Sequence, residues 1–169
     1  DFTRFNFFPY DELAASFREF AECLGECRYT KCTHRKEEGC AVIEKMNRLK
    51  IGCDLSHLNE KSFFAAIEEA EFPLATHSNC KKICCHPRNL TDTQIKFLCE
   101  KGGIMSLCFY PLFLGQNVMQ KIYENIFHIA ELGFENNIAI GSDFDGGEMN
   151  KCLDNISKIP DLYCFLSKK

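Results

Sequence analysis

The sequence lacks several features that would place it in a broad functional class. It has no run rich in lysine or arginine and a formal net charge of -4, so we expect neither nucleic acid nor an anionic membrane as a partner. It has no apolar run long enough to span a bilayer, and no basic stretch followed by an apolar core that would mark a signal peptide. We therefore expect a cytoplasmic location. Because the sequence does not begin with methionine, we also expect a fragment or a processed product.

Cysteine, in contrast, is abundant, with 12 in 169 residues. In a secreted protein this count would indicate a disulfide framework, but nothing in the sequence indicates secretion. Cys53, Cys99 and Cys108 lie inside apolar runs, where a free cysteine behaves as a small buried hydrophobic residue. We expect mostly reduced thiols, with some disulfides or a cysteine-bound metal as the alternative.

The apolar pattern from residue 37 onward alternates between helices and short strands, within a length that fits one domain. Helical spacing predicts helices at about 37–49, 60–70, 91–101 and 117–133. The third is predicted to begin with Thr91 as its N-cap and to stop at Gly102. Short buried strands are predicted at 51–57, 72–78, 104–110 and 137–147. This alternation predicts a parallel sheet with crossover helices on its outside. The first 36 residues are less clear, although residues 11–24 have a helical pattern.

Three polar residues stand at the ends of predicted strands. His57, His77 and Asp143 each follow a buried run, and in a parallel sheet all such ends share one rim. Two imidazoles and a carboxylate at one rim make a zinc or manganese site. The alternative is that each residue only forms hydrogen bonds at the surface or in the core.

Four blocks in the same order carry a family resemblance: "CDLSHLNEKSFF", "PLATHSNCKKICCHPRNLTD", "KGGIMSLCFYPLFL" and "IAIGSDFDGG". Together they resemble the membrane (renal) dipeptidase family of zinc peptidases, in the amidohydrolase-like TIM-barrel superfamily. The resemblance covers about residues 37–165. It implies an α/β fold, part of a (β/α)8 barrel, in which 37–169 supply barrel strands five to eight with outer helices. Residues 1–36 would then form a separate N-terminal helical segment of unclear role.

The resemblance also implies roles for individual residues. His57 and His77 match two histidines that hold one of two zinc ions, and Asp143 matches a carboxylate near the other ion that handles protons. Arg88 matches the arginine that binds the terminal carboxylate of a dipeptide substrate. These residue types suit the chemistry, since neutral imidazoles bind zinc, bound zinc acidifies water, and a planar guanidinium binds a carboxylate through two parallel hydrogen bonds.

The sequence also departs from the family pattern. The His-x-Asp metal motif of the first strand is absent, and the zinc-bridging glutamate is not found, since Glu12, Glu19, Glu22 and Glu26 lie in the helical stretch. His34 is the only candidate for the histidine that polarises the scissile carbonyl, and its spacing to His57 is too short. The family's last helix is also missing from the pattern. We expect half a barrel that retains one zinc ion or none and has no measurable dipeptidase activity on its own.

Two further functions stay open beside the zinc dipeptidase. One is a catalytically inactive dipeptidase-like fragment or binding module. The other is a cysteine-based metal or redox module, for which Cys80 and Cys84 would need a second pair such as Cys23 and Cys27. The two open edges of a half-barrel would also allow a homo-oligomer, or a covering by the N-terminal segment. His86 and His128 are interpreted as a loop residue and a helix-face residue.

Overall fold

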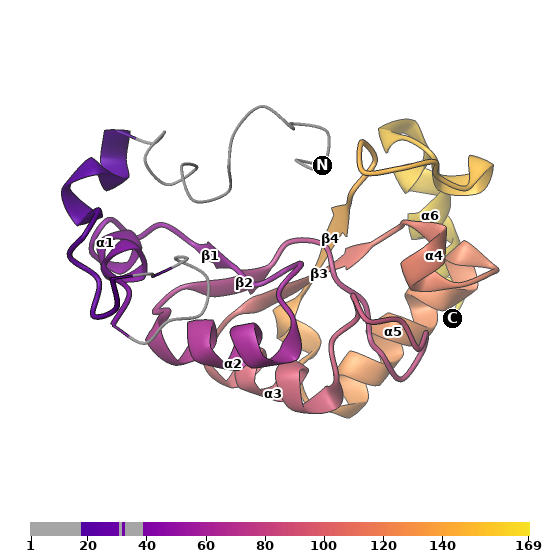
Figure 1. Ribbon diagram of the computed structural model, residues 1–169. Coiled ribbons are helices and arrows are strands. Elements are labelled where there is room, and N and C mark those ends of the chain that lie inside the picture. The colour runs from indigo at the N-terminus through magenta and orange to yellow at the C-terminus, as the bar shows by residue number, and fades with distance from the viewer. Residues whose placement is uncertain (1–17, 31, 33–38) are drawn as a thin grey trace.

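A four-stranded parallel sheet forms the centre of the protein in a computed structural model, which describes residues 18–30, 32 and 39–169 (Figure 1). The strands are paired in chain order, β1-β2-β3-β4, and every pair is parallel. They are β1 (Cys53–Asp54), β2 (Pro73–Ala75), β3 (Ile104–Cys108) and β4 (Ile138–Ser142). The parallel sheet predicted from the alternating pattern is therefore confirmed.

The helices between the strands cover the outer face of this sheet, as expected (Figure 1). α2, α3 and α5 lie along one face of the sheet, whereas α1 lies beside β1 together with η3 (Figure 1). The α-helices are α1 (Ala41–Arg48), α2 (Glu60–Glu69), α3 (Asp92–Glu100), α4 (Pro111–Leu114), α5 (Val118–Glu131) and α6 (Ile159–Leu166). The 3-10 helices are η3 (Arg18–Cys23), η4 (Glu135–Asn137), η5 (Lys151–Leu153) and η6 (Ile156–Lys158). No helix in the described part of the chain has the length and apolar character needed to cross a membrane.

Local hydrogen bonds explain where the central helices begin and end. Thr91 caps α3 in a reciprocal capping box with Gln94, and Gly102 follows the helix with a φ of 76°, a conformation that glycine adopts without strain. The far end of α2 is capped by Lys101, whose Nζ donates to the backbone oxygens of Ile67 at 2.6 Å and Glu68 at 2.9 Å. The helix α3 predicted with Thr91 as its cap is thus confirmed.

The core lies between the helical layer and the sheet. It joins apolar side chains of α2, α3 and α5 to those of the strands, all of them almost fully buried: Leu55, Phe63, Ile67, Ile95, Leu98, Met105, Leu107, Ile122 and Ile129. Cys53, Cys99 and Cys108 are buried with 9%, 6% and 0% of their surface exposed, as their apolar surroundings predicted. Nine cysteines are free thiols in the structure: Cys23, Cys53, Cys80, Cys84, Cys85, Cys99, Cys108, Cys152 and Cys164.

Helices lie near both ends of the described chain, α6 at one end and η3 at the other. No helix was predicted after the last strand, but α6 follows β4; it has Pro160 in its first turn, and its pattern is weak because only Leu162 is buried. Whether the family's last helix is absent stays a prediction. The predicted helical stretch at 11–24 lies partly outside the described residues, and its described part is the 3-10 helix η3. Phe20 of η3 packs against the common core, and Glu22 pairs with Lys45 of α1 at 3.0 Å. The proposed boundary at residue 36 stays a prediction.

Candidate metal and substrate site

The three predicted metal-site residues follow strands that end at the same edge of the sheet. β1 ends at Asp54, β2 at Ala75 and β4 at Ser142, and the strands are parallel, so the segments carrying His57, His77 and Asp143 leave the sheet at one end. His57 and Asp143 have φ angles of 72° and 68°, a left-handed conformation that is rare for residues other than glycine. Such backbone strain concentrates at functional sites, where the surrounding structure holds it in place.

The Nε2 atoms of the two histidine rings lie close together. The Nε2 atoms of His57 and His77 lie 2.7 Å apart, and the ring centroids are 4.8 Å apart with an interplanar angle of 62°. In tetrahedral zinc coordination, two ligand nitrogens at about 2.0 Å from the ion lie about 3.3 Å apart. A small rotation of either ring would therefore open this pair to a shared ion, and the chemistry of the donor set fits zinc.

A hydrogen-bond chain behind His77 fixes which of its nitrogens is free. The Thr76 hydroxyl donates to Oδ2 of Asp54 at 2.6 Å, and the same hydroxyl oxygen lies 2.7 Å from Nδ1 of His77. Because a hydroxyl has one proton and a carboxylate only accepts, Nδ1 of His77 must be the donor to Thr76. The lone pair of His77 is therefore on Nε2, the atom that faces His57. Hydrogen-bonded partners of this kind orient metal-binding histidines in many proteins.

Neither Asp54 nor Thr76 was among the residues predicted for the site. Burial by itself would raise the pKa of the Asp54 carboxyl, but hydrogen bonds from Thr76 and Ser56 together hold that pKa below its usual value. Asp54 is therefore a charged acceptor near neutral pH. The sequence did contain a signal for it, an acidic residue within the apolar run that ends at His57.

The electrostatic surroundings keep His57 in its neutral form. Partial desolvation at the rim lowers its pKa, and the positive charge of Arg88 and the neighbouring His77 act in the same direction. The carboxylates of Asp143 and Asp54 act in the opposite direction without reversing the shift. A neutral imidazole is the form that binds metal ions, so these surroundings favour a ligand role.

Arg88 presents unsatisfied donors beside this rim. Its guanidinium carbon lies 5.1 Å from the centre of the Phe113 ring, a cation–π arrangement, while Nη1 and Nη2 are buried without a hydrogen-bond partner. Burial lowers the pKa of Arg88, and the neighbouring Cys108, Asp143 and Asp54 raise it. Buried donors without partners cost free energy, about 1–3 kcal/mol or more for a charged group. An anionic ligand would remove that cost.

Buried asparagines hold the loop that carries Arg88. Asn89 donates from Nδ2 to the backbone oxygens of Cys84 at 2.8 Å and Phe113 at 2.7 Å, which joins the loop to α4. Asn125 of α5 accepts from the backbone N–H of Cys80 at 2.7 Å. The loop between β2 and α3 therefore has a defined conformation, and Arg88 is held by it.

Asp143 lies in the glycine-rich turn after β4. Its backbone oxygen accepts from the N–H of Gly146 at 2.9 Å, and a Cβ at Gly146 would overlap its carboxylate oxygens. Cys108 of β3 lies 3.8 Å from its Oδ2. The turn thus folds the carboxylate over Gly146, where only a residue without a side chain fits.

The other histidines are not part of this arrangement. Nδ1 of His86 accepts from the backbone N–H of Arg88 at 3.2 Å, so His86 is a loop residue that supports Arg88. His128 on α5 pairs with Asp92 at 2.8 Å. His34, the candidate for the carbonyl-polarising histidine, lies outside the described residues.

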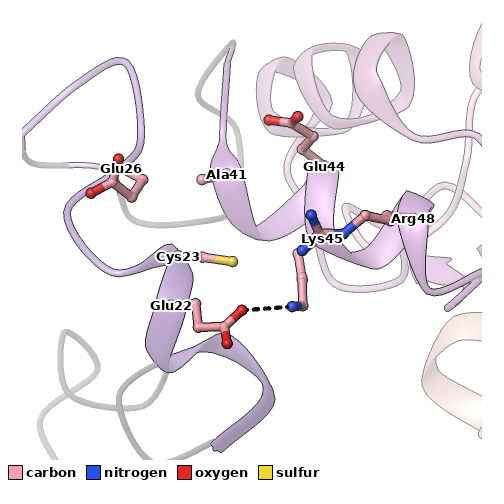
Figure 2. A pocket seen from close by; sticks show the side chains of 7 residues that line it. All are labelled: Glu22, Cys23, Glu26, Ala41, Glu44, Lys45 and Arg48. Carbon is pink, nitrogen blue, oxygen red and sulfur yellow. Dashed lines mark hydrogen bonds and ion pairs between the residues drawn. The ribbon is translucent and has the colours of Figure 1, made fainter.

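The cysteine knuckle considered from the sequence does not form. Cys80 is fully buried with its backbone bonded to Asn125, and it does not approach Cys23 or Cys27 as a ligand would. Instead, the described residues bring together the thiols of Cys27, Cys32 and Cys40. A nearby pocket between η3 and α1 is lined by charges of both signs, among them Glu22, Glu26, Glu44, Lys45 and Arg48, and includes none of the predicted site residues (Figure 2).

A comparison with protein families identifies the chain. A family model described as membrane dipeptidase, peptidase family M19, matches residues 19–169. The chain belongs to the membrane dipeptidase family. The family predicted from four sequence blocks is therefore confirmed, and the match begins within η3, before the region where we recognised the resemblance.

Individual relatives give the same result. A protein of Klebsiella pneumoniae, described as uncharacterized and encoded in the pqqA 5' region, is 35% identical over 132 residues, which are 73% of this chain and 49% of that protein. An uncharacterized dipeptidase of Schizosaccharomyces pombe is 33% identical over 138 residues, covering 78% of this chain and 34% of that protein. The chain thus spans about half of these relatives' length or less.

A solved structure shows the same fold. The metallo peptidase from Rhodobacter sphaeroides, liganded with a phosphinate mimic of the dipeptide L-Ala-D-Ala, aligns with a TM-score of 0.72 and 29% identity. The alignment covers 82% of this chain and 40% of that chain. The four strands and their helices therefore correspond to a part of a dipeptidase fold.

Proposed function

We propose that the chain supplies one half of a zinc-dependent dipeptidase site, with His57 and His77 as ligands of one ion. The observation that carries this proposal is the 2.7 Å approach of the two Nε2 atoms at the strand ends, with Nδ1 of His77 held by Thr76. Membership in a dipeptidase family supports the reaction class, namely hydrolysis of the peptide bond of a dipeptide. When bound, zinc makes water a better nucleophile near neutral pH.

The chain's own residues would then bind and orient the substrate. Arg88 has two unpartnered buried nitrogens, and we propose that they bind the terminal carboxylate of the dipeptide in a bidentate manner. The fixed loop conformation positions this guanidinium before substrate binds, which lowers the entropic cost of binding. Asp143, in its turn beside Cys108, would accept the proton of the attacking water and deliver it to the leaving amine.

The small number of proposed metal ligands explains why we expect no dipeptidase activity from the 169 residues alone. Stable zinc sites have three or four protein ligands, and a hydrolytic two-metal site needs a group that bridges both ions. Within the described residues, no group of three or more candidate ligands includes His57, His77 or Asp143. Among the described residues, a second ion would have Asp143 as its lone proposed protein ligand. An inactive dipeptidase-like module is therefore the second candidate function for the isolated chain.

Two assays separate these possibilities. In the first, the purified chain receives excess Zn²⁺ and L-Ala-D-Ala, the dipeptide whose mimic occupies the Rhodobacter relative, and free amino acid is measured with and without a chelator. We expect no release above background. Chelator-sensitive release that is abolished by His57→Ala would contradict this expectation. The missing ligands would then come from residues 1–36 or from a second copy of the chain, and light scattering would detect the second copy.

In the second assay, residues 37–169 replace the corresponding part of the Rhodobacter metallo peptidase. We expect this chimera to hydrolyse the dipeptide and to lose activity with His57→Ala or His77→Ala. His128→Ala is the matched control, because His128 of α5 pairs with Asp92 of α3 and not with either rim histidine. A folded chimera that stays inactive beside an active parent would overturn the proposed roles and favour the inactive module.

A further inference from the structure

Three thiols converge at the start of α1. One sulfur from each of Cys27, Cys32 and Cys40 lies within 4.8 Å of the other two. Cys40 is buried with 2% of its surface exposed, while Cys27 and Cys32 are half-buried. None of the three belongs to the histidine rim, and their spacing, C-x4-C-x7-C, differs from the paired cysteines considered in the sequence. The cluster therefore has no role in the proposed dipeptidase site.

Backbone hydrogen bonds hold the turns that carry these thiols. The N–H of Arg28 donates to the backbone oxygen of Gly39 at 3.1 Å, which joins the residue after Cys27 to the residue before Cys40. The N–H of Cys32 donates to the oxygen of Tyr29 at 3.1 Å, which holds Cys32 close to the segment that follows Cys27. Gly39 has a φ of 69°, and a Cβ there would lie 3.0 Å from Cβ of Arg28. The close approach of the two segments thus requires a glycine at this position.

The spacing of the sulfurs fits a thiophilic metal ion. With Zn–S bonds of about 2.3 Å, tetrahedral coordination puts two sulfurs about 3.8 Å apart, so the cluster needs to contract by about 1 Å at most. We propose that Cys27, Cys32 and Cys40 form a thiolate site for a soft divalent ion of the zinc class, with the fourth position left to a ligand outside the triad. Thiolates select such ions, whereas the imidazoles and carboxylates of the rim accept a wider range.

The position of the triad indicates what a bound ion would do. Cys40 is the N-cap residue of α1, and Cys27 follows the 3-10 helix η3, which lies beside α1 at the β1 end of the sheet (Figure 1). An ion bound there would tie the segment after η3 to the start of α1. Its role is structural, because binding free energy at such sites stabilises the folded state.

Forming the Cys40 thiolate costs free energy that a bound cation would have to offset. Burial raises the pKa of the Cys40 thiol, while the backbone N–H groups of Ile43 and Val42 and the neighbouring Cys32 act in the opposite direction. The thiol therefore favours its protonated form until a cation compensates the charge.

The test uses the complete chain, purified under reducing conditions and freed of metal. Co²⁺ is added as a spectroscopic substitute for Zn²⁺, because thiolate ligands give an intense sulfur-to-cobalt charge-transfer absorption that imidazole and carboxylate ligands do not. We expect one thiolate-bound cobalt per chain, displaced by Zn²⁺. Cys27→Ser and Cys32→Ser should each remove or strongly weaken the absorption. The double variant Cys152→Ser/Cys164→Ser is the matched control, because both thiols are exposed and outside the triad.

Two further measurements keep the result interpretable. His57→Ala should leave the charge-transfer absorption unchanged, which separates this site from the rim. If circular dichroism shows that a serine variant does not fold, the extent of alkylation of each cysteine is measured in the unmutated chain with and without Zn²⁺. Bound Zn²⁺ should protect Cys27, Cys32 and Cys40 together. Absence of the absorption, its survival in all triad variants, or a disulfide between two of these cysteines under the same reducing conditions would overturn the proposal.

Discussion

The Thr76 hydroxyl offers the sharpest test of how the rim is organised. It makes two short hydrogen bonds, to Asp54 at 2.6 Å and with Nδ1 of His77 at 2.7 Å. Thr76→Val keeps the shape of the side chain and removes both bonds. The bond to a charged carboxylate is worth about 1.5–3 kcal/mol and a neutral bond about 1 kcal/mol. The acceptor Asp54 would keep its bonds from the backbone N–H groups of Ser56 at 3.0 Å and Thr76 at 3.1 Å, which limits the loss.

Two consequences should be measurable. Without Thr76 as acceptor, His77 is no longer restricted to the form with hydrogen on Nδ1, so nitrogen NMR of its imidazole should show a mixture of tautomers in place of one. Loss of a partner behind a metal-binding histidine typically weakens metal binding about 10- to 100-fold. A zinc titration followed at the His77 nitrogen signals should therefore require correspondingly more zinc in Thr76→Val than in the unmodified chain.

Matched variants separate this effect from general destabilisation. Thr76→Ser keeps the hydroxyl and should retain the single tautomer. Thr93→Val makes the same substitution at an exposed position of α3 and should leave His77 unchanged. If Thr76→Val kept both the Nδ1-protonated tautomer and the unmodified zinc titration, the inferred hydrogen-bond chain from Asp54 to His77 would be wrong.

Three further predictions concern the rim and the core. In the active chimera, Arg88→Lys should raise KM for the dipeptide, since lysine cannot form the bidentate contact; unchanged KM and kcat would remove Arg88 from the substrate site. Gly141→Ala should destabilise the chain by about 1–3 kcal/mol in urea denaturation and shift the His77 NMR signals, because a Cβ there would overlap the backbone oxygen of Thr76; unchanged stability and signals would refute that contact. Iodoacetamide at about pH 8 should alkylate exposed Cys152 long before Cys108, because burial raises the Cys108 pKa to about 11 and the thiol stays protonated; equal rates in the folded chain would contradict its burial.

Much of the fold could be predicted because local patterns and tertiary structure agree. Apolar residues at helical spacing predicted the helices that cover the sheet, and the capping residue Thr91 and Gly102 marked the limits of α3 within one residue. His57 and His77 could be named because each directly follows a short buried run, and parallel strands bring such positions to one edge.

The remaining parts depend on contacts that a linear pattern does not contain. Asp54 and Thr76 are 22 positions apart, and their hydrogen bond exists only in the register that pairs Asp54 with Leu74. The thiol triad arises from two backbone turns and from Gly39, and so its cysteines do not have the spacing of a familiar motif. α6 was missed because only Leu162 of its residues is buried, and a helix with one buried position leaves little periodicity to detect.

The strands lie in the sheet in the same order as they occur in the chain, and this order affects how the sheet forms. Each strand pairs with the strand that is one strand–helix unit away, and none pairs with a strand farther along the described chain. The entropy lost in closing each loop is therefore small, and folding rates rise as contacting residues come closer in sequence. Every helix between two strands can cover their apolar face as soon as the pair has formed. We expect these four strands to join the sheet one at a time in chain order, with β1 pairing with β2 before β3 and β4 are added.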